Sequence, residues 1–203
     1  INLEKTFLKS IKKRIIFCAS STHPKEENEI AKAHLTLKKK YKSLLTIIVP
    51  RHTDRVKEIY DQLISLNLKT IIRTSNKKIL NNTDIYLVNT YGETKKFFNI
   101  SKIVFIGGSI INHGGQNPIE PARFGLNILH GPNVQNFKDI YHLFNKLKIA
   151  HKFINTKQLI NISDKLLKSE KNKKLNLTKM GNLILKKSVI EIDKVLNNEL
   201  KKT

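Results

Sequence analysis

The segment Gly114–Pro121 (GGQNPIEP) has the residue types of a ligand-binding helix start. Asn117 suits an N-cap, Pro118 suits the first helical position, and Glu120 stands third in the helix. Such a helix start presents free N–H groups and the positive end of the helix dipole, which favour a phosphate. The diglycine Gly114-Gly115 lets a ligand approach the backbone closely. Glu120 then either bonds back to the Asn117 amide in a capping box or accepts hydrogen bonds from ribose hydroxyls.

Glycines and polar residues also follow three short apolar runs. Gly107-Gly108-Ser109 comes directly after one run, where two glycines either bring N–H groups to a ligand or simply form a tight turn. Arg51 follows Pro50, where a guanidinium can form a fork with a phosphate. In Tyr91-Gly92-Glu93 the glycine allows close approach to a base or phosphate, whereas Glu93 has the alternative of capping the next helix.

Histidines and the single cysteine do not form a metal or nucleophile motif. There is no His-Glu-x-x-His sequence and no G-x-S-x-G elbow, so we expect neither a metal nor a cofactor. Cys18 lies in an apolar run and is expected to be a buried hydrophobe. Thr22, His23 and His52 are expected at strand ends, and His34, His142 and His151 on exposed surfaces. The residues therefore indicate a binding site without a general-base pair.

The elements that position these residues are short β-branched runs alternating with amphipathic stretches. The stretches 26–41 and 53–66 have the helical period. Runs of this kind between helices predict an α/β fold of Rossmann type, a parallel sheet with helices on both faces. Ligands of such sheets bind at the carboxyl ends of the strands. The expected strands are 15–19, 44–49, 70–72, 85–88, 103–106, 127–129 and 152–154.

We expect residues 1–154 to form one domain and residues 155–203 to form a helical extension. The extension is predicted to contain helices 157–167 and 171–200, packed on the domain or bridging from it. The chain opens at Ile1 and its only methionine is Met180, which is expected of a fragment or a processed product.

The formal charge of +22 favours a polyanionic partner such as nucleic acid, anionic lipid head groups or a phosphorylated glycolipid. Nucleic-acid modules usually interleave aromatic residues and glycines with their basic residues, whereas the Lys-rich stretches here have few aromatics. A basic nucleic-acid module is therefore the less favoured alternative. No apolar stretch of the given sequence approaches the ~18 residues that a membrane span needs, and no segment of it resembles a signal peptide; an anchor upstream of Ile1 stays an open alternative. We expect a soluble chain in a reducing, cytosol-facing location.

Six motifs in order resemble the C-terminal half of the 3-deoxy-D-manno-octulosonic acid (Kdo) transferases, and the match runs from about Ile15 to Phe144. They are Ala19-Ser20-Ser21-Thr22-His23 with Glu26, Pro50-Arg51-His52, Tyr91-Gly92-Glu93, Ile106-Gly107-Gly108-Ser109, Gly114-Gly115-Gln116-Asn117-Pro118-Ile119-Glu120-Pro121-Ala122, and Gly131-Pro132 with Asn136-Phe137. The resemblance implies one half of a GT-B glycosyltransferase, in which two Rossmann-like domains face each other.

The resemblance further implies that this half binds the donor CMP-Kdo without a metal. The residues implied around CMP are Pro50, Arg51, Tyr91, Gly92, Glu93, Asn117, Pro118, Ile119 and Glu120, with Thr22, His23, Gly107, Gly108, Ser109 and Gly115 as additional candidates. The N-terminal domain, absent from this chain, is implied to carry the catalytic carboxylate and to hold a phosphorylated lipid A precursor. The full protein is implied to act in lipopolysaccharide biosynthesis at the cytoplasmic face of the bacterial inner membrane.

The sequence departs from the family pattern at several motif positions. Pro24-Lys25 stand where the family tends to have glycine, Asn89 replaces an aspartate, Thr94 replaces a leucine, and Gln116 replaces the more frequent histidine. A GT-B domain that uses another nucleotide sugar, such as a UDP donor, therefore remains the alternative.

Overall fold

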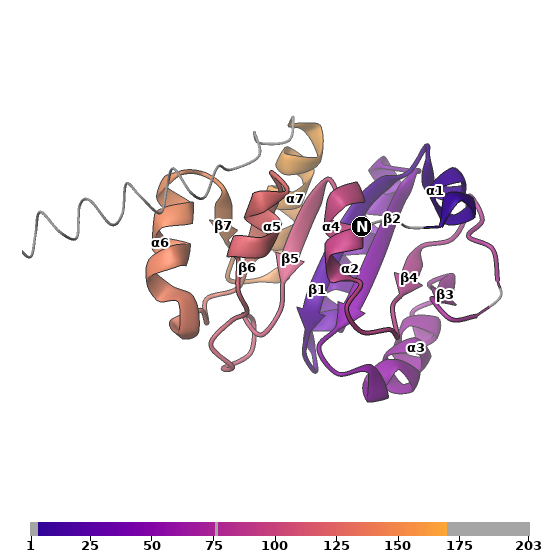
Figure 1. Cartoon of the computed structure of the whole chain (residues 1–203), viewed down its shortest axis with the longest axis horizontal. Coiled ribbons are helices and arrows are strands. Elements are labelled where there is room, and N and C mark those ends of the chain that lie inside the picture. The colour runs from indigo at the N-terminus through magenta and orange to yellow at the C-terminus, as the bar shows by residue number, and fades with distance from the viewer. Residues whose placement is uncertain (1–3, 76, 170–203) are drawn as a thin grey trace, which may run out of the picture.

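The computed structural model describes residues 4–75 and 77–169. In these residues the chain forms a seven-stranded parallel sheet with the order β3-β4-β2-β1-β5-β6-β7 (Figure 1). The strands are β1 (Ile15–Thr22), β2 (Leu44–Pro50), β3 (Thr70–Ile72), β4 (Ile85–Leu87), β5 (Ile103–Ile106), β6 (Asn127–His130) and β7 (Ala150–Lys152).

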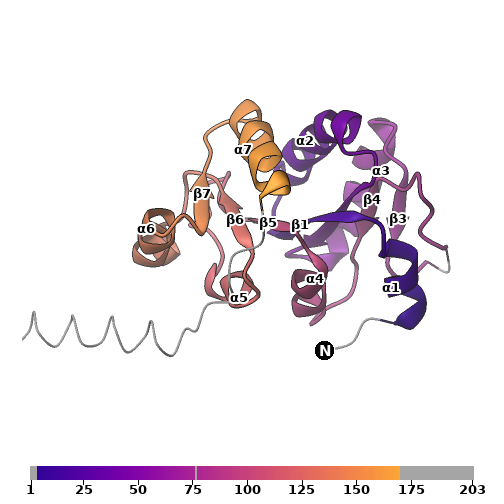
Figure 2. The same ribbon diagram turned by 90° about the horizontal axis from the view of Figure 1, so that it is seen from above.

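Helices cover both faces of this sheet. Figure 2 shows α2, α3 and α7 on one side and α1, α4, α5 and α6 on the other. Their bounds are α1 (Lys5–Ile11), α2 (Glu26–Lys40), α3 (Val56–Ser65), α4 (Thr94–Ile100), α5 (Ile119–Arg123), α6 (Lys138–Lys146) and α7 (Thr156–Lys168), with 3-10 turns η1 (Thr53–Arg55) and η2 (Gln135–Phe137). The predicted α/β class with a parallel sheet is confirmed.

Two hydrophobic clusters fill the spaces between the sheet and the helices. Successive strand residues alternate between them because side chains of a strand point to opposite faces. On β1, for example, Ile16 and Cys18 belong to the cluster under α1, α4, α5 and α6, whereas Phe17 and Ala19 belong to the cluster under α2, α3 and α7. Cys18 is fully buried, as predicted. The continuous apolar runs are thus explained by burial on both faces.

The strand order reverses at β1, which pairs with β2 on one side and with β5 on the other. From β1 the chain passes to β2, then to the edge strand β3, and then to β4, which lies between β2 and β3. It next crosses to β5 on the other side of β1 and continues outward through β6 to β7. The loops after β1 and β5 therefore lead to helices on opposite faces of the sheet. Open α/β sheets bind ligands in the crevice between two such loops.

Element boundaries differ from the prediction mainly at the edges of the fold. The last strand is 150–152 rather than 152–154, because Ala150 and Phe153 are buried whereas Ile154 is exposed. The predicted helix 157–167 is present as α7, which packs on α2. The predicted helix 171–200 lies outside the described residues. The helices α1, α4 and α6 were not predicted as separate elements.

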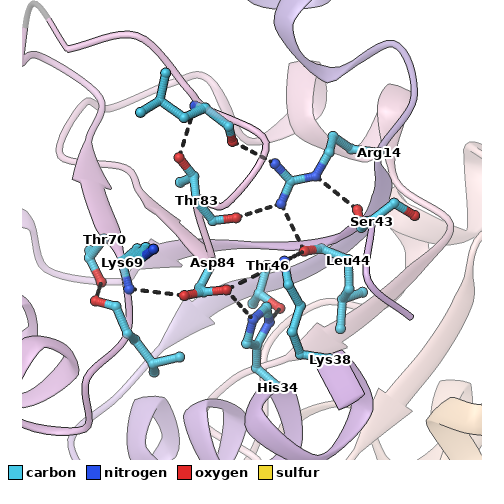
Figure 3. Close-up of polar contacts among 12 residues, drawn as sticks. Arg14, His34, Lys38, Ser43, Leu44, Thr46, Lys69, Thr70, Thr83 and Asp84 are labelled. Atoms are coloured by element: carbon cyan, nitrogen blue, oxygen red, sulfur yellow. Dashed lines mark hydrogen bonds and ion pairs between the residues drawn. The ribbon is translucent and has the colours of Figure 1, made fainter. Parts of the chain in front are cut away.

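A polar network fastens the amino end of the sheet (Figure 3). His34 on α2 was expected to be exposed, but it is fully buried, and its Nδ1 lies 2.8 Å from Thr46 Oγ1 on β2. Its Nε2 lies 3.6 Å from Asp84 Oδ1, and Lys38 Nζ lies 3.4 Å from the same oxygen. Burial acts to raise the pKa of Asp84, but the nearby His34 and Lys38 side chains and the N–H of Lys69, which donates to Asp84 Oδ2 at 3.0 Å, hold that pKa at about 2. This network joins α2, β2 and the residues preceding β4.

Candidate functional site

The carboxyl edge of the sheet is organised by a buried carboxylate, Glu26, at the start of α2. Its Oε2 accepts the N–H groups of His23 (2.9 Å) and Gly108 (2.8 Å), and its Oε1 accepts those of Ser109 (3.0 Å) and Ile110 (2.9 Å). The side chain is 0% exposed. Burial raises the pKa of Glu26, and the four N–H donors act against that rise. Sequence reasoning quoted Glu26 only as part of a motif and missed this role.

Glu26 changes the interpretation of Gly107-Gly108-Ser109. The Gly108 and Ser109 amides, which we considered as ligand donors, donate to Glu26 instead. Gly107 is required by close packing, since a Cβ there would lie 2.1 Å from the Ser21 carbonyl oxygen. The buried Ser109 hydroxyl donates to the Ile106 carbonyl at 2.6 Å and accepts the Gly131 N–H at 2.9 Å. Gly107 and Ser109 therefore shape the edge from inside the protein.

The diglycine Gly114-Gly115 forms a loop that other segments hold in place. Both residues have positive φ, +90° and +75°, which disfavours any other residue type. The Gly115 N–H donates to the Gly108 carbonyl at 2.7 Å, and the Asn136 N–H donates to the Gly114 carbonyl at 2.9 Å. A Cβ on Gly114 would meet the Asn136 side chain at 2.6 Å. These contacts thus hold the loop against Gly108, which follows β5, and against Asn136, which follows β6.

The helix that follows begins one residue later than predicted: Pro118 rather than Asn117 is its N-cap, and Ile119 is its first residue. Asn117 still contributes to the helix start, since its Oδ1 accepts the Ile119 N–H at 2.9 Å. Pro118 directly precedes the five-residue helix α5. Glu120 makes no capping-box bond to the Asn117 amide; its carboxylate forms an ion pair with Lys95 on α4 at 3.1 Å. The Glu120 side chain is 39% exposed. The carboxylate is therefore accessible, and the ion pair joins the starts of α4 and α5.

The Tyr91-Gly92-Glu93 motif divides into an exposed part and a fixed part. Tyr91 is 73% exposed, and a Cβ on Gly92 would meet no atom within 4 Å. Glu93 accepts from Arg73 Nε at 2.9 Å and from Arg73 Nη2 at 3.1 Å, and also from Thr90 and Lys96. The Arg73 guanidinium holds the pKa of Glu93 at about 2. Glu93 therefore fixes the loop after β4, while Gly92 leaves open space above it.

The β2 end carries Pro50, Arg51 and His52. The Arg51 N–H donates to the Thr22 carbonyl at 3.0 Å, which ties this loop to the end of β1. The exposed Arg51 guanidinium forms no hydrogen bond or ion pair with any described residue. Thr22 Oγ1 is buried, and none of the described residues forms a hydrogen bond with it. The following turn is anchored by an ion pair between Arg55 and the buried Glu27 at 2.9 Å.

Imidazole rings gather between the ends of β1, β2 and β5. The His23 ring centroid lies 4.1 Å from that of His113 and 6.0 Å from that of His52. His23 is 5% exposed, and its Nε2 lies 3.4 Å from Gln116 Nε2. Burial, together with the charges of His113, His52, Arg51 and Arg55, lowers the pKa of His23 to about 4. Sequence reasoning placed His23 and His52 at this edge and missed His113.

A cavity adjoins the loop after β4. This cavity, of about 920 Å³, lies between α1 and the segment after β3, with Thr90 and Glu93 on its wall. The described residues contain no cluster of three His, Cys, Asp or Glu side chains that could hold a metal ion. No helix in the part of the chain that the structure describes is long and apolar enough to cross a bilayer.

Comparison with known proteins places this arrangement in a family. No family model matches the chain. The chain is 38% identical over 130 residues to a 3-deoxy-D-manno-octulosonic acid transferase of Haemophilus influenzae, which covers 64% of this chain and 30% of the relative. It is 32% identical over 165 residues to the enzyme of that name from Rickettsia bellii, which covers 81% of this chain and 39% of the relative.

Solved structures agree with the sequence comparison. The C-terminal CMP-Kdo binding domain of WaaA from Acinetobacter baumannii superposes with a TM-score of 0.75 at 28% identity, covering 79% of this chain and 85% of that one. The C-terminal domain of the glycosyl transferase LpcC from Francisella tularensis, at 12% identity and a TM-score of 0.52, shares the fold alone.

The fold and the position of the candidate site define a Rossmann-like domain of the kind found in the C-terminal half of GT-B glycosyltransferases. More narrowly, the chain belongs to the 3-deoxy-D-manno-octulosonic acid transferase family and corresponds to its C-terminal domain. It spans 30% and 39% of the length of the two relatives named above.

Proposed function

We propose that this chain is the donor-binding half of a glycosyltransferase that transfers Kdo, and that it binds CMP-Kdo. The observation that carries the proposal is the convergence of the family motifs on the carboxyl edge of the sheet, where the strand order reverses. The similarity to a domain described as CMP-Kdo binding supports the choice of donor.

The nucleotide site in this proposal lies beside the starts of α4 and α5. Arg51, whose guanidinium has no partner among the described residues, takes the donor phosphate. Gly92 lets the base or phosphate come close, and the exposed carboxylate of Glu120 accepts ribose hydroxyls. Pro50, Tyr91, Asn117, Pro118 and Ile119 line the same site. Glu93, Thr22, Gly107, Gly108, Ser109 and Gly115 set its shape through the contacts described above.

The reaction is attack by an acceptor hydroxyl on the anomeric carbon of Kdo, with CMP as the leaving group. Negative charge develops on the departing phosphate, and Arg51 stabilises that charge without a metal. The catalytic carboxylate and the acceptor, a phosphorylated lipid A precursor, belong to an N-terminal domain outside this chain. The chain alone therefore binds donor and does not catalyse transfer.

The charge of the chain fits an enzyme that works at a membrane surface. With a formal charge of +22, the chain is attracted to anionic head groups, and each well-placed Lys or Arg contributes about 1 kcal/mol there. In this proposal the full protein acts at the cytoplasmic face of the inner membrane in lipopolysaccharide biosynthesis. Nucleic acid is not a partner.

Calorimetric titration of the chain with CMP, UDP and GDP tests the proposal. CMP is expected to bind more tightly than UDP or GDP. The variant Arg51→Ala is expected to weaken CMP binding by about 10- to 100-fold, because a hydrogen bond to a charged group contributes about 1.5–3 kcal/mol. Arg123→Ala is the matched control, since Arg123 is another exposed arginine, at the end of α5. A preference for UDP would instead identify a GT-B domain for another nucleotide sugar.

A further inference from the structure

The histidine cluster at the carboxyl edge brings together three imidazole rings and a guanidinium from three strand ends. His23 follows β1, Arg51 and His52 follow β2, and His113 lies in the loop after β5. The His23 ring is the centre, at 4.1 Å from His113 and 6.0 Å from His52 between ring centroids. The His23 ring thus lies beside two further imidazoles at the point where the strand order reverses, and Arg51 is close enough for its charge to act on His23.

No acidic side chain neutralises this cluster within the described residues. Arg55, which also acts on His23, is paired with Glu27 and Glu58. The Glu26 carboxylate accepts the His23 N–H, but both of its oxygens are occupied by backbone donors. The pKa of His23 is lowered to about 4 because burial and the neighbouring positive groups disfavour its charged form. A bound anion next to the ring would favour the charged form and so raise the pKa of His23.

The cluster is set apart from the residues that we assign to the nucleoside. Gly92 precedes α4 and Glu120 lies in α5, and both helices cover one face of the sheet. His23 and His52 lead into α2 and α3, which cover the other face (Figure 2). We therefore assign the nucleoside of the donor to the side of α4 and α5 and its anionic groups to the cluster.

We propose that His23, His52, His113 and Arg51 form an oxyanion subsite that binds the phosphate or the sugar carboxylate of the donor. The inference rests on the proposed donor function and adds the histidines as its recognition elements. Gln116, whose Nε2 lies 3.4 Å from His23 Nε2, completes the subsite with an uncharged amide. Imidazoles suit this task because each presents an N–H donor in a defined direction and gains charge when an anion is near.

Titration of the chain with cytidine, CMP and CMP-Kdo tests the subsite. Cytidine carries neither anionic group, CMP adds the phosphate, and CMP-Kdo adds the carboxylate. The double variant His52→Ala/His113→Ala removes two exposed rings whose side chains form no hydrogen bond with other described residues. His142→Ala on α6 is the matched control, since His142 is also an exposed histidine. Equal urea midpoints for the three proteins establish that folding is unchanged.

We expect the double variant to bind CMP or CMP-Kdo at least tenfold more weakly, with cytidine affinity within twofold of the wild type. A loss that appears already with CMP identifies the phosphate, and a loss seen only with CMP-Kdo identifies the carboxylate. Either result supports the subsite. An equal loss for cytidine, or unchanged affinity for all three ligands, overturns it while the proposed donor function stands. If the wild type binds none of the three ligands, the donor function itself is overturned.

Discussion

The role of Glu26 makes a quantitative prediction for the variant Glu26→Gln. In the wild type each carboxylate oxygen accepts two backbone N–H groups, so all four donors are satisfied. A glutamine has one oxygen and one NH₂ group. In either orientation of its amide, two of the four N–H groups face a donor and lose their acceptor.

Each buried donor without an acceptor costs about 1–3 kcal/mol, so the variant should lose about 2–6 kcal/mol of unfolding free energy. This is a large share of the about 5–15 kcal/mol typical of a domain. The assay is urea unfolding followed by circular dichroism. Glu58→Gln is the matched control, because Glu58 is an exposed residue whose ion pair with Arg55 contributes about 0–1 kcal/mol. A Glu26→Gln midpoint equal to that of the control would refute the assignment of the four amides to a carboxylate.

Three further predictions follow from the same edge. Gly114→Ala should destabilise the chain by about 1–3 kcal/mol in urea unfolding, because its φ is +90° and the new Cβ would meet Asn136 at 2.6 Å; an unchanged midpoint would contradict the loop geometry. The pKa of His23 in the folded chain, about 4, lies below its ordinary value of 6.5. Between pH 4 and pH 6.5 the unfolded chain therefore binds more protons than the folded chain does. As a result, the free energy of unfolding falls as the pH drops from 6.5 to 4. His23→Gln should remove up to about 1.4 kcal/mol per pH unit of that slope, and an identical slope in wild type and variant would contradict it. Glu120→Gln should weaken CMP binding in calorimetry and leave the melting temperature nearly unchanged, because its ion pair with Lys95 is at the surface; a large loss of stability with unaltered binding would return Glu120 to a structural role.

Local sequence determined the strands, the helices α2, α3 and α7, and the start of α5 at the candidate site. Residues 103–106 are apolar in succession, which in a parallel sheet reflects burial on both faces. Asn117 and Pro118 have the capping chemistry of a helix start, and the structure has that helix. These features were predictable because each depends only on residues that are close together in the sequence.

Tertiary structure alone decided which polar groups face one another. Glu26 lies 82–84 residues from three of its four donors, and Glu93 meets Arg73 across 20 residues. From the sequence, His34 was predicted to be an isolated histidine on the surface, yet it is buried and contacts Thr46. A hydrogen bond or an ion pair acts over only a few ångströms, so its partner is set by strand order and register. Sequence patterns placed the glycines and charges at strand ends, and the folded sheet determined whether each one is free for a ligand or already held by the protein.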